Sequence, residues 1–243
     1  MGIYLNGTSA YGLFRRESEA MYFVDKTELL SELVPLVGAG TDESEELDRN
    51  QGKGQRYVAI TRPRRFGKTV MANMIASYFG KGIDSRRTFS RLKAAGYDWF
   101  EKHLNRHNVI HIMFHEMPDE RIGYDGYINR IKAGLMDDLA MAYPSVRIRE
   151  TDAVWDVLTK VYEYCGGETF IFVLDEWDFI YHQDFVTDRE KESFTKFLSN
   201  LLKDKAYVEM AYMTGILPIA KYSSGSELNM FCEYTMVTEE RYG

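Results

Sequence analysis

The sequence predicts a three-layer α/β fold, in which a mostly parallel, five-stranded sheet lies between two layers of helices. Short apolar segments of strand length alternate with longer segments whose apolar residues recur at helical spacing. The short segments are apolar on both faces, as in parallel strands that are covered by helices. Strands separated by helices also need crossover connections, which place the strands parallel to one another.

The composition is that of an ordinary soluble domain. Of the 243 residues, 45% are hydrophobic and 28% are charged, which is enough for one full-sized core. The net charge of −7 excludes a globally basic surface for nucleic acid, although not a local basic patch. No apolar run approaches the ~20 residues of a membrane helix. With no signal peptide and two distant cysteines, Cys165 and Cys232, we expect a cytoplasmic protein with free thiols and no membrane partner.

The N-terminal part of the chain differs in character from the rest. The first 37 residues are expected to be partly helical, with a helix over Glu28–Val34 that Asp25 or Thr27 caps. The segment Gly38–Gln55 is rich in glycine and acids and is expected to be an exposed loop. We therefore divide the chain into residues 1–55, packed on the core, and a core of residues 56–243.

The strands and helices of the core follow one another in alternation. Four strands are predicted at residues 57–61, 109–114, 170–174 and 208–213, with a candidate fifth at 232–237. Helices are predicted at residues 69–79, 127–142, 152–164 and 189–202. Ligands of such sheets bind beyond the carboxyl ends of the strands, so the residues that follow each strand are the candidates for a functional site.

The turn after the first strand is similar to a phosphate-binding P-loop, G-x-x-x-x-G-K-[ST]. Gly67, Lys68 and Thr69 match its end, whereas Arg62 stands in place of the first glycine. Glycine lets the backbone approach phosphate oxygens, and the following helix directs free N–H groups at the anion. Lysine adds a point charge, and threonine offers a hydroxyl to Mg²⁺. The predicted phosphate-binding residues are Arg62, Pro63, Arg64, Arg65, Phe66, Gly67, Lys68, Thr69 and Val70.

Two acids follow the third strand, which is the most apolar one. Opposite a P-loop, Asp175 is expected to hold Mg²⁺ together with Thr69, and Glu176 to activate the attacking water. Thr214 ends the fourth strand, where it either senses the γ-phosphate or simply finishes the strand before a glycine turn. Glu176, Lys68 and Thr214 are thus the candidate catalytic residues of a P-loop NTPase.

Two weaker patterns favour structural roles. His107, His111 and His115 recur every four residues, with Glu116 next, but only His111 lies inside a predicted strand, so a metal site is not favoured. Tyr22 and Phe23 offer aromatic rings that could stack on a base, although packing in the core is the preferred interpretation.

Four segments of the chain resemble the predicted AAA-ATPase-like family of bacteria. They are residues 22–27 (YFVDKT), 61–69 (TRPRRFGKT), 174–178 (LDEWD) and 214–216 (TGI) with 228–229 (LN). The resemblance implies an ATPase core with strand order 5-1-4-3-2, in which an arginine at the first glycine position is usual. It also implies a following nuclease-like domain of the PD-(D/E)XK type, so we expect this chain to be shortened. Trp177, in place of tyrosine, and a longer loop at residues 38–55 depart from the family pattern.

The function that these observations favour is Mg²⁺-dependent hydrolysis of ATP to ADP, in a regulatory or motor module for the nuclease-like domain. No arginine finger can be assigned, so dependence on a homo-oligomer stays open. Nucleic acid is expected only through the following domain. Three alternatives also stay open: a nucleotide-gated switch with little turnover, a P-loop kinase, and a DNA-associated scaffold, against which the acidic balance weighs.

Overall fold

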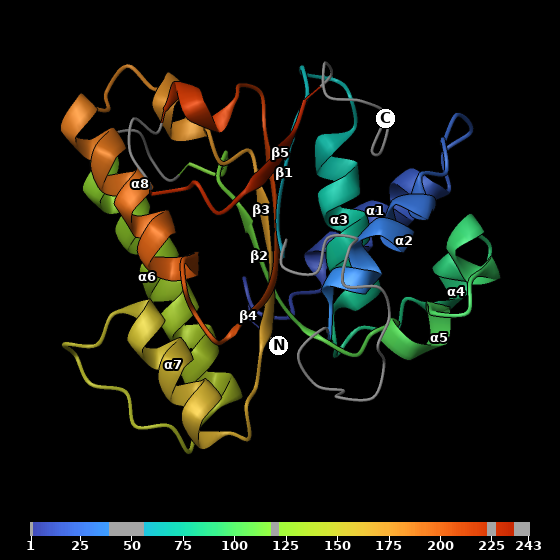
Figure 1. The fold of residues 1–243 in the computed structure, drawn as a ribbon, viewed down its shortest axis with the longest axis horizontal. Helices are drawn as coiled ribbons and strands as arrows, with labels where there is room; N and C mark the ends of the chain where they lie inside the picture. Colours follow the sequence, from blue (N-terminus) through green and yellow to red (C-terminus); the bar gives the residue numbers. More distant parts are fainter. Residues whose placement is uncertain (1, 39–55, 118–121, 223–226, 236–243) are drawn as a thin grey trace.

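A five-stranded parallel sheet forms the centre of the protein (Figure 1). The computed structural model describes residues 2–38, 56–117, 122–222 and 227–235. The strands are β1 (Tyr57–Thr61), β2 (Asn108–Met113), β3 (Phe170–Asp175), β4 (Val208–Gly215) and β5 (Cys232–Tyr234). They pair in the order β2-β3-β4-β1-β5, and every pair is parallel. This order, read from β5, is the predicted 5-1-4-3-2, and the α/β fold class is confirmed.

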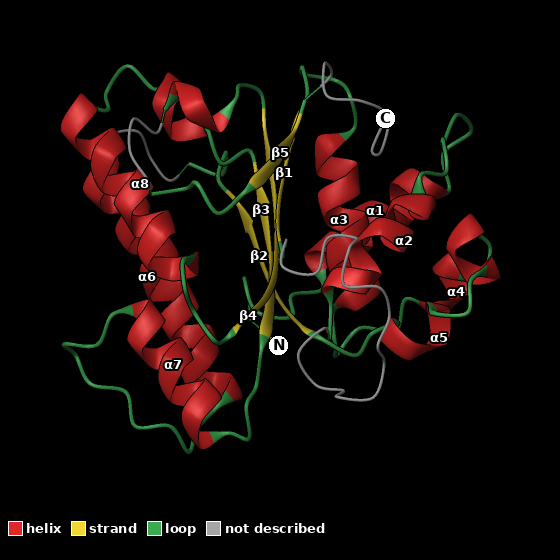
Figure 2. Cartoon of the chain, in the orientation of Figure 1, coloured by secondary structure: helices red, strands yellow, loops and turns green. Residues whose placement is uncertain are grey.

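Helices cover both faces of the sheet (Figure 2). One layer contains α1 (Ser9–Ser18), α2 (Leu30–Leu33), α3 (Lys68–Phe79), α4 (Arg86–Phe89) and α5 (Phe100–His103). The other contains α6 (Gly123–Ala142), α7 (Val154–Tyr164) and α8 (Asp188–Leu202). Short 3-10 turns lie at Thr27–Leu29, Val34–Leu36, Lys93–Gly96, Phe179–His182 and Ile219–Lys221. The predicted core helices are therefore confirmed, with ends displaced by a few residues.

Alternate residues of each strand enter two different cores. In β1, Val58 and Ile60 pack in the core beneath α1, α2 and α3, whereas Tyr57 and Ala59 pack in the core beneath α6, α7 and α8. All five residues of β1 are buried, which explains why its sequence is apolar without alternation. The sheet is thus sealed on both faces, and its strand ends are where ligands can reach it.

The N-terminal segment packs on both helical layers. Phe14 of α1 stacks on Phe89 with ring centroids 5.1 Å apart, in the core that also holds α3. The buried carboxylate of Asp138, in α6, accepts hydrogen bonds from the backbone N–H groups of residues 3, 4 and 5. Contacts of α1 and of residues 3–5 therefore anchor the N-terminal segment to the core, and the proposed division at residues 55 and 56 stays a prediction. Most of the predicted Gly38–Gln55 loop lies outside the described residues.

The helix predicted over Glu28–Val34 is wrong in its continuity. The chain forms a 3-10 turn, a single α-helical turn at Leu30–Leu33 and a second 3-10 turn. Pro35 has no N–H group to donate to the carbonyl of Ser31, so a regular helix cannot continue past Val34, whereas the 3-10 turn at Thr27–Leu29 precedes the reach of this proline. Leu30 and Leu33 are nevertheless both fully buried, as their spacing predicts.

A pair of histidines makes the stability of the fold depend on pH. His103 Nδ1 lies 3.1 Å from His107 Nε2, and burial followed by the positive charge of His107 lowers the pKa of His103 from 6.5 to about 4. At pH values between about 4 and 6.5, the unfolded chain binds more protons than the folded one, so the stability of the fold decreases as the pH decreases.

We predict that acidification from pH 6.5 to pH 4 removes about 3 kcal/mol of stability through His103 alone. Urea unfolding as a function of pH measures this slope in the wild-type protein and in His103→Gln. The variant should show a smaller loss of stability over this pH window, and an equal loss in both proteins would contradict the assignment.

Candidate functional site

The turn Arg62–Thr69 joins β1 to α3 at the carboxyl edge of the sheet. Gly67 directly precedes α3 and has a φ of +76°, a conformation that side chains with a Cβ rarely adopt. Arg65 has a φ of +70°, so two residues of the loop are in the left-handed backbone conformation. The N–H of Arg62 donates to the carbonyl of Gly215 at 3.1 Å, which ties the start of the loop to the end of β4. The free N–H groups at the start of α3 therefore open onto this edge.

Lys68 lies within the curve of its own loop. Its ammonium group donates to the carbonyls of Arg62 and Pro63, both at 2.9 Å, and the side chain is buried. Burial lowers the pKa of Lys68 from its ordinary value, whereas the negative charges of three acids act in the opposite direction. These acids are Glu176, Asp175 and Asp178, which places the lysine within electrostatic reach of the residues that follow β3.

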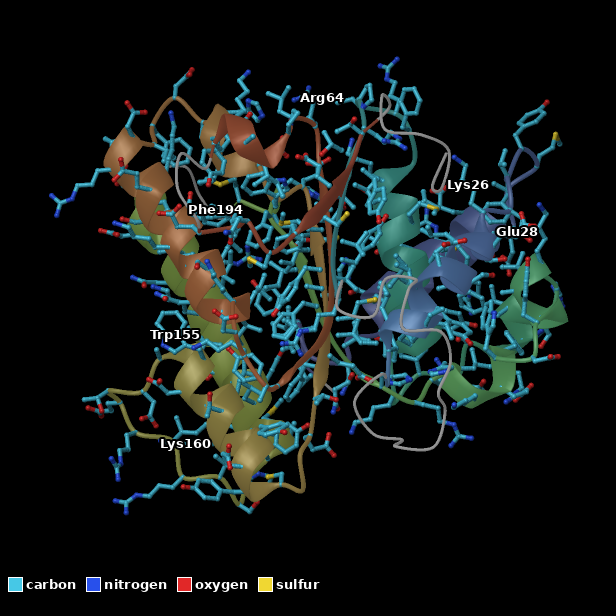
Figure 3. All side chains as sticks on the ribbon, in the orientation of Figure 1. Lys26, Glu28, Arg64, Trp155, Lys160 and Phe194 are labelled. Carbon is cyan, nitrogen blue, oxygen red and sulfur yellow. The ribbon has the colours of Figure 1, made fainter. Side chains whose placement is uncertain are left out.

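The other predicted loop residues divide into three groups. The guanidinium of Arg62 donates to the carbonyls of Thr61 at 3.1 Å and Tyr234 at 3.2 Å, so this side chain links β1 to β5. Pro63, Arg64, Arg65 and Phe66 are exposed at the edge of the sheet, and Thr69 and Val70 are half-buried in the first turn of α3. Figure 3 shows Arg64 at the upper edge of the sheet.

Asp175 lies at the floor of the site and has no exposed surface. Its Oδ1 accepts a hydrogen bond from the hydroxyl of Thr214, while its buried Oδ2 has no hydrogen-bond partner in the described part of the chain. The same hydroxyl accepts a bond of 3.1 Å from the N–H of Glu176. Thr214, the candidate phosphate sensor, is therefore in contact with the two acids and holds them in place.

Glu176, the residue directly after β3, has an uncommon backbone conformation. Its φ is +53°, in the left-handed region, which costs a residue with a Cβ about 1 kcal/mol or more. Its Oε2 lies 3.6 Å from Nδ1 of His115, which follows β2. Sequence reasoning considered His115 only as a metal ligand, although its position after a neighbouring strand was the signal that places it here.

The residues after the acidic pair fasten β3 to β4. Asp178 is buried, and its Oδ2 accepts from the N–H groups of Ile216 at 2.9 Å and Leu217 at 3.2 Å. Trp177 is also buried, and a Cβ at Gly215 would lie 2.5 Å from its indole nitrogen. The tryptophan that departs from the family pattern thus packs directly on the glycine that ends β4.

The sheet brings the loop and the acids to one edge. β4 lies between β1 and β3, and its last residues pair with the ends of both: Gly215 with Thr61, and Met213 with Leu174. Because all three strands are parallel, Lys68 and Asp175 follow strand ends that face the same side. The predicted phosphate-binding loop and the predicted acids therefore lie at the same edge of the sheet.

The three spaced histidines separate in the fold. His107 contacts His103 and Glu209, His111 lies within β2, and His115 faces Glu176. Among the described residues, no group of three or more His, Cys, Asp or Glu side chains is placed to hold a metal ion. Of the two residues expected from the sequence to hold Mg²⁺, Asp175 offers a buried carboxylate oxygen without a hydrogen-bond partner among the described residues, and Thr69 offers a hydroxyl in the first turn of α3.

Comparison with known proteins identifies the family. A sequence profile described as "Predicted AAA-ATPase" matches residues 47–224, which is more than half of the chain. The chain belongs to this family. Its membership indicates an ATPase-like protein and agrees with the resemblance that the loop and the acids predicted.

One curated relative matches the chain at low sequence identity. It is an "Uncharacterized protein in vnfD 5'region" of Azotobacter chroococcum mcd 1, 24% identical over 227 residues, or 88% of this chain. The chain spans 37% of the length of that protein. No solved structure matches the chain. No helix within the described ranges combines the length and the apolar character needed to span a bilayer.

We predict that Thr214→Val destabilises the protein by about 1–3 kcal/mol, because it leaves the buried Asp175 carboxylate and the Glu176 N–H without their shared partner. Valine has nearly the shape of threonine, so packing is preserved. Urea unfolding measures the effect, and Thr214→Ser, which keeps the hydroxyl, is the matched control. A Thr214→Val variant as stable as the wild type, with a loss of stability in Thr214→Ser alone, would show that the methyl group and not the hydroxyl matters.

Proposed function

We propose that the protein binds ATP with Mg²⁺ at the carboxyl edge of its sheet and hydrolyses it to ADP and phosphate. The observation that carries this proposal is that Lys68 lies within electrostatic reach of Asp175 and Glu176. The lysine follows β1 and the two acids stand at the end of β3, with β4 between these strands. Family membership supports the same ATPase-like function.

In this proposal, the loop binds the phosphates through its backbone and its lysine. The left-handed Gly67 keeps Cβ atoms away from the path of the anion, and α3 directs its free N–H groups and partial positive charge toward it. The Lys68 ammonium exchanges its bonds to the carbonyls of Arg62 and Pro63 for bonds to phosphate oxygens. Arg64 and Arg65 add positive charge at the exposed rim.

Two side chains are suited to hold Mg²⁺. Asp175 offers its Oδ2, which has no partner within the described ranges, and Thr69 offers its hydroxyl from the first turn of α3. When bound, Mg²⁺ neutralises charge on the phosphates. Thr214 fixes the orientation of the Asp175 carboxylate by binding its other oxygen.

Glu176 is the proposed general base that accepts a proton from the attacking water. Its side chain is about one-third exposed, so water can reach it, and its backbone is fixed by Thr214. His115 limits the orientations of the Glu176 carboxylate from the side of β2. A carboxylate in this place favours water as the acceptor of the phosphoryl group, and this disfavours a kinase.

The setting of this ATPase is also part of the proposal. We propose a cytoplasmic module that regulates or drives a nuclease-like domain in a longer protein, with nucleic acid contacted by that domain. If hydrolysis needs an arginine finger at the γ-phosphate, turnover would depend on a second copy of the chain or on another partner that supplies one.

We predict that Lys68→Ala abolishes measurable ATP binding, because the point charge at the phosphates is lost. Glu176→Gln should retain ATP affinity and lose hydrolysis by about 10²–10⁴-fold, since a neutral amide cannot take a proton from water. Calorimetric titration measures the affinity, and phosphate release measures the turnover.

The controls are Lys196→Ala and Glu192→Gln, which change exposed residues of α8 in the opposite helical layer. Both should behave as the wild type. Unchanged ATP affinity in Lys68→Ala would reject the site. Tight binding without phosphate release in the wild type would identify a nucleotide-gated switch, and ATP loss that requires an added acceptor would identify a kinase.

A further inference from the structure

A hollow in the surface lies directly beside the proposed phosphate-binding loop. It has a volume of about 180 Å³, and it is bounded on one side by Phe66 and Gly67 of the loop and by Val70 and Met71 of α3. Its other wall is the N-terminal segment from α1 to Lys26. If a ligand bound the loop through its phosphates, another part of the same ligand could therefore occupy this hollow.

The wall formed by the N-terminal segment is apolar and uncovered. Tyr22 is 89% exposed and Val24 is 69% exposed, and across the hollow Phe66 is 49% exposed. Large apolar side chains gathered in this way around one hollow mark a surface that a partner covers. Within the lining, the charged side chains are those of Glu17 and Lys26.

The polar residues that follow this wall hold it in position. Asp25 accepts hydrogen bonds from the N–H and hydroxyl of Thr27 with one oxygen and from the N–H of Lys93 with the other. The Thr27 hydroxyl also accepts from the N–H of Ala94. Behind Tyr22, Phe23 packs edge-on against the buried Phe14, with ring centroids 6.1 Å apart. Tyr22 and Val24 are therefore exposed on a segment that these contacts anchor to the rest of the protein.

We propose that this hollow binds the purine base of the nucleotide whose phosphates occupy the Arg62–Thr69 loop. Tyr22 stacks on the base, and Val24, Phe66 and Val70 pack around its edges. A base has apolar faces and a polar rim, which match apolar walls and the carboxylate of Glu17 as an acceptor for an exocyclic amino group. The inference rests on the proposed function, because the phosphates bring the base to this place.

The hollow also explains the segment of residues 22–27. Its polar members, Asp25 and Thr27, bind the backbone of residues 93 and 94, and its apolar members Tyr22 and Val24 face the hollow. Sequence reasoning preferred core packing for Tyr22 and Phe23. Phe23 does pack against the core, whereas Tyr22 stays uncovered and available to a ligand.

The test compares the binding of ATP with that of inorganic tripolyphosphate, both with Mg²⁺. Tyr22→Ala should weaken ATP binding by about 5- to 150-fold, the range that stacking of about 1–3 kcal/mol per base gives. Its affinity for tripolyphosphate, which has no base, should stay at the wild-type value. Tyr22→Phe should retain both affinities, and the neighbouring Met21→Ala, which is equally exposed but outside the hollow, is the matched control.

A fluorescent base provides a second, direct measurement. The triphosphate of 2-aminopurine riboside should lose fluorescence when it binds the wild type, because stacking on an aromatic ring quenches it, and this loss should disappear in Tyr22→Ala. The double variant Tyr22→Ala with Val24→Ser should weaken ATP binding further, since a second apolar wall is removed.

Two outcomes would overturn the base site: unchanged ATP affinity in the double variant, or equal weakening of ATP and tripolyphosphate. Failure of the proposed function has a different signature. In that case Lys68→Ala would bind tripolyphosphate as the wild type does, whatever the Tyr22 variants show. The same set of titrations therefore distinguishes a failure of the base site alone from a failure of the proposed function.

Discussion

The site depends on one buried carboxylate. Asp175 has no exposed surface, and a charge removed from water in this way costs several kcal/mol unless other groups compensate it. One oxygen is compensated by the hydroxyl of Thr214, and the other has no partner among the described residues. The positive charge that lies within reach is that of Lys68, which is itself buried. A lysine and an acid that are both withdrawn from solvent at one edge of the sheet are costly for the fold and suited to a charged ligand with its cation.

Much of this arrangement could be predicted from the sequence, because it follows from local patterns. The span of β1 is the predicted one, and β2, β3 and β4 differ from their predicted ranges by one or two residues at an end. Buried parallel strands are apolar throughout and end sharply at polar residues, so their ends are well defined in sequence. The topological rule for parallel sheets then places the loop after β1 and the acids after β3 on one side.

The contacts that fix the side chains could not be predicted, because they join distant segments. The bond between Thr214 and Asp175, the link from Arg62 to the carbonyl of Tyr234 and the approach of His115 to Glu176 all depend on which strands are neighbours. The positive φ of Glu176 leaves no mark in the sequence, since glutamate is not a residue that favours it. The leucine spacing predicted the burial of Leu30 and Leu33, but it did not show that 3-10 turns stand on both sides of a single α-helical turn.

The measurement that tests the central claim most directly is the effect of Mg²⁺ on ATP affinity in the wild type and in Asp175→Asn. If Lys68 and Asp175 serve one ligand, Mg²⁺ should strengthen ATP binding to the wild type, and this strengthening should be lost in the variant, whose folding circular dichroism would verify. The same strengthening by Mg²⁺ in both proteins would contradict the account, because the metal would then be held without the carboxylate at the floor of the site.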